Sequence, residues 1–146
     1  MTPRRLLVRI STAQLATAVA GLAVALRRGR SWDVRQPWLH SALLHGAPGH
    51  IRRDWLWSGT AYSAPAWVLA GQLWATRSLA AGPDDGARRM LGMLGVLMAP
   101  GYLAERYVRA HLRAGGWDPV ETPVVVTLIA LSAAMGVLGH RAQAGR

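Results

Sequence analysis

The 146-residue sequence contains no cysteine, which excludes disulfide bonds, thiolate catalysis and cysteine-ligated metal. It also lacks the short motifs that mark serine hydrolases, zinc proteases, phosphate-binding loops and dinucleotide-binding folds. Internal repeats, which would indicate the inverted halves of a transporter, are absent. These absences leave the distribution of charge and apolar residues as the main evidence of function class.

Lysine is absent too, so all 17 basic residues are arginines, and seven acidic residues leave a formal charge of +10. Such a charge is compatible with nucleic-acid binding if the arginines share one face of a folded domain. Instead they form short clusters between apolar runs: Arg4 and Arg5; Arg27, Arg28 and Arg30; Arg52 and Arg53; Arg88 and Arg89; Arg106, Arg109 and Arg113. This alternation is typical of membrane proteins, because charge is costly in hydrocarbon and favourable beside anionic headgroups. The pattern therefore argues against a nucleic-acid partner.

Four apolar runs have the composition of membrane-spanning helices, at residues 10–26, 55–76, 90–107 and 123–139. About 20 mostly apolar residues in a helix cross about 30 Å of hydrocarbon, and a helix pairs all its own amides. The basic start of the first run resembles a signal peptide, but three further runs favour an uncleaved first helix. We therefore predict an all-α fold, a single transmembrane domain built as an integral membrane four-helix bundle.

The boundaries of these runs carry interfacial and capping residues. Six of the seven tryptophans lie near predicted helix ends, where an amphipathic ring prefers the membrane interface, and only Trp67 lies at mid-span. Asp118 is placed to cap the fourth helix, with Glu121 three residues later. Residues 37–46 predict a short interfacial helix between the first and second spans.

The sequence does not predict which side of the membrane the termini face. If both termini share one side, eight arginines lie on that side and nine on the other, so the positive-inside rule gives no orientation. Small residues recur at spacings of four on three of the helices, as at Gly21, Gly95 and Gly136. Such stripes allow close helix packing, either within one chain or between copies of it.

Glu105 is the most informative candidate for chemistry, because a carboxylate near membrane depth is costly and usually functional. Tyr102 lies three residues earlier on the same predicted helix face, and Pro100 is expected to disturb that helix. The alternative is that Glu105 forms an ordinary ion pair with Arg109 at a solvated helix end.

The second run carries a polar face that includes Ser58, Tyr62 and Gln72, and Pro65 frees a carbonyl beside them. These side chains either hold neighbouring helices together or line a cavity for an amphipathic molecule. We take Ser58, Gln72 and the mid-span Trp67 as candidate ligand-binding residues.

Histidines in the first connection do not have the spacing of a metal site. His40, His45 and His50 are five residues apart, which is about 140° around a helix, whereas two ligands on one face need spacings of three or four. No metal or other cofactor is therefore predicted. A single histidine beside Asp33 or Asp54 is a better candidate for acid–base work, although Asp54 is also suited to cap the second helix.

Three functions are compatible with these observations. We favour a non-catalytic multi-pass protein of the cell membrane that acts as a partner, assembly factor or lipid-binding subunit. The alternative is a small membrane-embedded enzyme, an isomerase, cyclase or hydrolase, that treats a lipophilic substrate with Glu105, Tyr102, Tyr62 and Asp54 as catalytic groups. An ion or proton conductor is the least supported hypothesis, because conduction needs a chain of charged residues at membrane depth and Glu105 is the one candidate. The expected partners are the lipid bilayer, a lipophilic small molecule, another membrane protein or a second copy of the chain.

Overall fold

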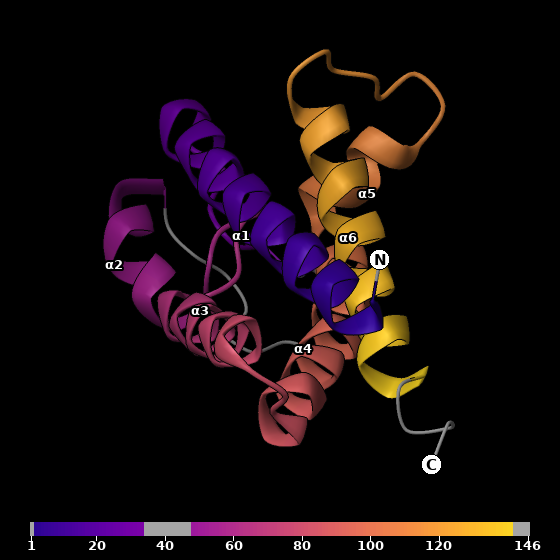
Figure 1. Cartoon of the computed structure of the whole chain (residues 1–146). Helices are drawn as coiled ribbons and strands as arrows, with labels where there is room; N and C mark the ends of the chain where they lie inside the picture. The colour runs from indigo at the N-terminus through magenta and orange to yellow at the C-terminus, as the bar shows by residue number, and fades with distance from the viewer. Residues whose placement is uncertain (1, 34–47, 142–146) are drawn as a thin grey trace.

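The computed structural model describes residues 2–33 and 48–141, and this part of the chain is all-helical, as the sequence predicts (Figure 1). The elements are α1 (Pro3–Arg28), the 3-10 turn η2 (Pro48–His50), α2 (Ile51–Trp57), α3 (Ala66–Ala81), α4 (Asp85–Ala104), α5 (Arg106–Leu112) and α6 (Glu121–Arg141). The interfacial helix predicted at residues 37–46, with His40 and His45, lies outside the described residues.

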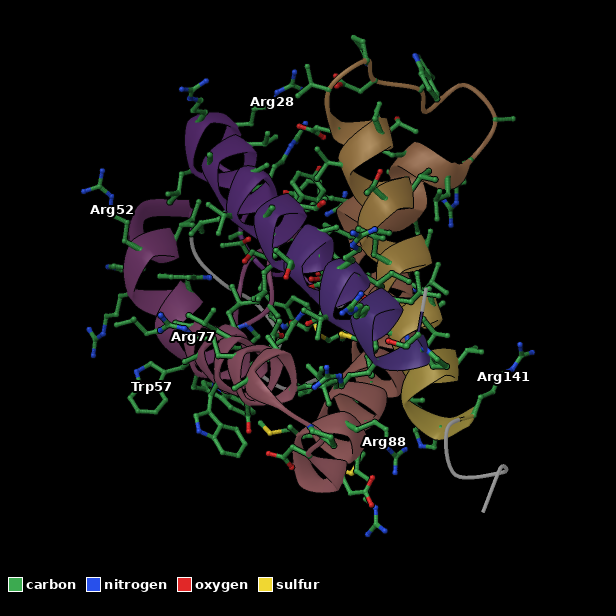
Figure 2. The ribbon with its side chains drawn as sticks, viewed as in Figure 1. Arg28, Arg52, Trp57, Arg77, Arg88 and Arg141 are labelled. Atoms are coloured by element: carbon green, nitrogen blue, oxygen red, sulfur yellow. The ribbon has the colours of Figure 1, made fainter. Side chains whose placement is uncertain are left out.

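The four longer helices, α1, α3, α4 and α6, pack in alternating directions. Contacts join the end of α1 to the start of α6, and the start of α4 to the end of α6. The first residue of α1 and the last of α6 consequently lie on the same side of the molecule (Figure 1). Arg28 marks one end of the packed helices, and Arg88 and Arg141 mark the other (Figure 2).

Two predicted helices are divided in the structure. The run at 55–76 forms α2 and α3, separated by the non-helical residues 58–65. Gly59 has φ of +86°, a left-handed conformation that ends α2, and Pro65 disfavours a helical residue before it. Trp67 consequently lies in the first turn of α3 and not at mid-helix.

The run at 90–107 forms the second half of α4 and the start of α5, with a break at Glu105. Pro100 does not cause it, because α4 continues through that residue to Ala104. At the break, the Arg106 amide donates to the Asp33 carbonyl at 3.0 Å instead of continuing the helical ladder. The chain after α1 therefore ends α4 by competing for its backbone hydrogen bonds.

Buried residues recur every three or four positions on each long helix. On α1 they are Leu7, Ser11, Gln14, Ala18, Gly21 and Ala25. This spacing places one face of the helix inward, and that face includes polar side chains. Large apolar side chains lie on the outside of the four helices, among them Val19, Trp67, Leu73, Trp74, Met93, Val96, Leu97, Val126 and Val137.

Glycines bring α4 and α6 together. A Cβ added to Gly95 would lie 2.3 Å from the Gly136 nitrogen, and one added to Gly139 would lie 2.3 Å from the Gly92 Cα. The small residues of these two helices therefore join elements within one chain, which is one of the two roles that the sequence left open.

Two helices, α1 and α6, are long and apolar enough to cross a membrane, with mean hydropathies of 1.5 and 2.0 over their best windows. Helix α3 has 16 residues, about 24 Å at the usual rise per residue. The first turn of α4 carries Asp85, and Arg88 and Arg89 follow. Length and composition alone thus support a membrane helix at α1 and at α6.

Candidate functional site

The central feature is the non-helical segment 58–65, whose residues 59–64 are buried between the packed helices. Its backbone is partly self-satisfied, because the Thr60 amide donates to the Ser63 carbonyl at 2.8 Å. It approaches α1 so closely that a Cβ on Gly21 would lie 2.2 Å from the Tyr62 carbonyl oxygen. We call this segment the buried loop.

On one side of the buried loop, Tyr62 joins an acidic and basic cluster. Its hydroxyl donates to Glu121 Oε2 at 2.5 Å and lies 3.2 Å from His111 Nε2, which also contacts Glu121. His111 Nδ1 is 2.9 Å from the Gly116 carbonyl, and because a carbonyl only accepts, Nδ1 carries the proton of that bond. Tyr62 and Glu121 are fully buried, whereas His111 keeps some exposed surface at the edge of the cluster.

Arg28 at the end of α1 and Arg30 just after it complete this cluster. Arg28 Nη1 lies 3.0 Å from Glu121 Oε1, and Arg30 Nε lies 3.2 Å from the same oxygen. Arg30 also stacks over the ring of Tyr107 at 4.9 Å from its centroid. The carboxylate of Glu121 is thereby neutralised by side chains from the opposite end of the sequence.

Asp118 forms the outer edge of the same cluster and caps α6, as the sequence predicts. Its Oδ1 accepts from the amides of Val120 and Glu121 at 2.8 Å, and its Oδ2 is 2.7 Å from Arg28 Nη1. These amides and the Arg28 guanidinium hold the pKa of Asp118 well below its usual range.

Glu105 lies between α4 and α5, and its side chain is fully buried. Both of its carboxyl oxygens lie close to the Asp33 amide, at 3.2 and 3.0 Å. Glu105 is therefore not at a solvated helix end, which was the alternative that the sequence left open.

A second polar set lies in the core between α1 and α3. Gln72 Nε2 donates to Gln14 Oε1 at 2.8 Å and to Ser11 Oγ at 3.1 Å, and Ser11 is 2.7 Å from Thr76 Oγ1. Gln14 Nε2 reaches the Tyr102 hydroxyl at 3.5 Å. These bonds join α1, α3 and α4, so Gln72 holds helices together here.

On its other side, the buried loop forms the wall of an open groove of about 440 Å³ between α3 and α4. The groove is lined mostly by apolar residues: Trp32, Ala64, Pro65, Trp67, Val68, Met93, Leu94, Leu97, Met98 and Gly101. Its polar lining comes from Ser58, Ser63 and Tyr102. We call it the loop groove.

The structure thus sorts the predicted site residues into different places. Ser58, Trp67 and Tyr102 line the loop groove, whereas Tyr62 and Glu105 are buried outside its lining. Gln72 lies in the core polar set, and Asp54 lies within α2, half-buried, rather than capping a helix.

Sequence reasoning missed Glu121 and His111 as site residues. Glu121 looked like a helix-capping residue after Asp118, and its partners Arg28 and Tyr62 are 93 and 59 positions away. The available signal was an acidic residue directly before a long uncharged run, which places a carboxylate close to membrane depth.

Comparison with protein families, with curated proteins and with solved structures finds no match to this chain. The loop groove and the buried polar clusters are therefore the evidence of function that this chain offers.

Proposed function

We propose that this protein is a multi-pass membrane protein, crossing the bilayer with α1, α3, α4 and α6, and that it binds a lipophilic small molecule in the loop groove without chemically changing it. The helices support the membrane part of the proposal, because polar side chains such as Gln14, Gln72 and Ser132 point inward while Leu73, Val96 and many other large apolar side chains face outward. This is the reverse of a water-soluble bundle and suits a hydrocarbon solvent.

The observation that carries the ligand-binding part is the chemistry of the loop groove. Its volume of about 440 Å³ falls in the range of small-molecule sites, and its walls are mostly aromatic and aliphatic side chains. The Tyr102 hydroxyl is bonded to the buried Gln14, and Ser63 is buried too, so the half-buried Ser58 is the most accessible polar residue of the lining. Such a site favours a mostly apolar ligand.

The placement of the titratable groups favours binding over catalysis. Glu105, Glu121 and His111 do not line the loop groove, and the first two are fully buried with partners of their own. A general acid or base must come within hydrogen-bonding distance of the group on which it acts.

The test uses Gly101, which lines the loop groove and whose added Cβ would meet nothing within 4 Å. We expect Gly101→Leu to fill the groove while leaving the fold intact, because leucine is a better helix former than glycine by up to about 1 kcal/mol. The purified wild-type protein in mild detergent should release a specific lipophilic compound on denaturation, detected by mass spectrometry, and Gly101→Leu should release less than a tenth as much.

Gly82→Leu serves as the matched control, because Gly82 lies at the turn after α3, has open space around its Cβ and has extended backbone. It should release the same compound as the wild type. If all three proteins release only bulk phospholipid, or if Gly101→Leu retains the compound, the loop groove is not a ligand site.

A membrane-embedded enzyme is the second candidate, and one observation favours it: the buried loop that forms the groove wall also places Tyr62 against Glu121 and His111. In this case the loop would have to expose these groups to the ligand. Glu121→Gln and Glu105→Gln proteins would then accumulate a precursor of the compound that the wild type releases. Identical compounds in all samples would support binding alone.

A further inference from the structure

A second apolar groove lies on the opposite side of α3, between α3 and α1, and has a volume of about 610 Å³. Small residues create it, because Thr12 and Ala16 on α1 face Ala66 and Ala70 on α3 where larger side chains would close the space. Larger apolar residues line the remainder: Val8, Leu15, Val19, Trp55, Leu69 and Leu73. We call it the α1–α3 groove.

The α1–α3 groove is shorter than the full hydrocarbon thickness of a bilayer. Along α3 it extends from Ala66 to Ala80, fourteen residues or about 21 Å at the helical rise of 1.5 Å per residue. The part from Ala66 to Arg77 covers about 16 Å, close to the roughly 15 Å that one leaflet contributes. An extended acyl chain therefore matches this part of the groove better than a crossing helix, which would span about 30 Å.

Arg77 supplies a charge near one end of this groove, about one helical turn before Ala80. It lines the groove and also a neighbouring depression that it shares with Trp74 and Ser78. Within the described part of the chain Arg77 forms no ion pair, and its side chain is exposed. Trp74 is 60% exposed beside it, one helical turn earlier, as is usual for a residue at the membrane interface.

An apolar groove with an unpaired arginine about one leaflet's depth along it has the charge pattern of an anionic phospholipid site. We propose that the α1–α3 groove binds one acyl chain of an anionic phospholipid and that Arg77 pairs with its phosphate headgroup. The inference rests on the membrane placement proposed above, and it is independent of the ligand in the loop groove.

The test compares phosphatidylglycerol with phosphatidylcholine of the same acyl chains, each added to the purified full-length protein in detergent and counted by native mass spectrometry. We expect the wild type to retain phosphatidylglycerol about fivefold more than phosphatidylcholine, the effect of one cation beside an anionic lipid. Arg77→Gln should remove this preference. Arg89→Gln should keep it, because Arg89 is exposed at the same end of the molecule but lines neither groove.

A second variant tests the acyl-chain part. Ala16→Leu fills the α1–α3 groove and leaves Arg77 in place, so it should lose retention of both lipids by a similar factor. Equal retention of the two lipids by the wild type would overturn the proposal, as would equal losses in Arg77→Gln and Arg89→Gln, which would indicate only attraction to a chain of charge +10. Unchanged retention by Ala16→Leu would overturn the groove as the acyl site. None of these outcomes depends on Gly101, so failure here is distinguishable from failure of the loop groove.

Discussion

At the residue scale, Glu121 shows how a carboxylate can be placed inside this molecule. It has no exposed surface, yet each of its oxygens has partners: two arginines on Oε1, and Tyr62 and His111 on Oε2. Removing one partner of a buried charge costs more than forming the pair contributes, because the remaining charge keeps its desolvation penalty. The Tyr62 hydroxyl is the most sensitive point, since it lies fully inside the protein.

We therefore predict that Tyr62→Phe destabilises the protein by about 1–3 kcal/mol, the usual cost of leaving a buried hydrogen-bonding group unpaired. The free energy of unfolding can be followed by titrating the detergent-solubilised protein with sodium dodecyl sulfate. Tyr107→Phe is the matched control, because the phenylalanine ring keeps its stacking against Arg30. It should change stability by less than about 0.5 kcal/mol. Equal changes in the free energy of unfolding for the two substitutions would show that the Tyr62 hydroxyl stabilises the protein no more than the Tyr107 hydroxyl does.

The same scale shows which residues the sequence could predict. Glu105 stood out because its own position, at the end of an apolar run, is unusual for a carboxylate. Asp118 could be recognised from its neighbours, since a helix cap is a local interaction that the structure confirms. The cluster at Glu121 could not be recognised from the sequence, because its arginines and tyrosine are brought together only by the packing of α1, α6 and the buried loop.

At the element scale, hydropathy predicted the positions of the long helices and missed their interruptions. The hydropathy of an apolar run is the same in both cases: when the run forms one continuous helix, and when it forms two helices joined by a loop. Pro65 was visible in the sequence as a source of disturbance in the helix, but residues 59–64 stay buried only because Gly21 admits their backbone against α1. The close approach of the loop backbone to Gly21 is a tertiary contact, which cannot be recognised in a single sequence.

The packing of α4 on α6 gives a prediction at this scale. A Cβ on Gly95 would lie 2.3 Å from the Gly136 nitrogen, so the two helices must separate to admit it. We expect Gly95→Ala to destabilise the protein by about 1–3 kcal/mol, as overpacking does elsewhere. Gly101→Ala, six residues later in the same helix, should be neutral or stabilising by up to about 1 kcal/mol, because its Cβ meets open space. The same detergent titration measures both, and a neutral Gly95→Ala would show that α4 and α6 are not in close contact.

At the scale of the whole molecule, the distribution of polarity bears on the number of spans. Helices α1 and α6 are long and apolar enough to cross a membrane, whereas α3 and α4 do not meet the same criteria. The argument for spans at α3 and α4 is their packing, because they bury Gln72 and Tyr102 while exposing Leu73, Trp74 and Leu97. The proposed four spans therefore depend on the assembled bundle and not on each helix separately.

Site-directed cysteine labelling decides between two and four spans, and a chain without native cysteine needs no background removed. Single cysteines replace Thr2 before α1, Pro83 between α3 and α4, and Ala114 between α5 and α6, all of which are exposed. With four spans, Thr2→Cys and Pro83→Cys lie on one side of the membrane and Ala114→Cys on the other. A membrane-impermeant maleimide applied to sealed cells, before and after permeabilisation, should therefore label the first two alike and the third oppositely. If only α1 and α6 cross, the whole segment between them lies on one side, and Pro83→Cys would label together with Ala114→Cys. That result would remove α3 and α4 from the membrane and leave their outward apolar side chains to be covered by another protein.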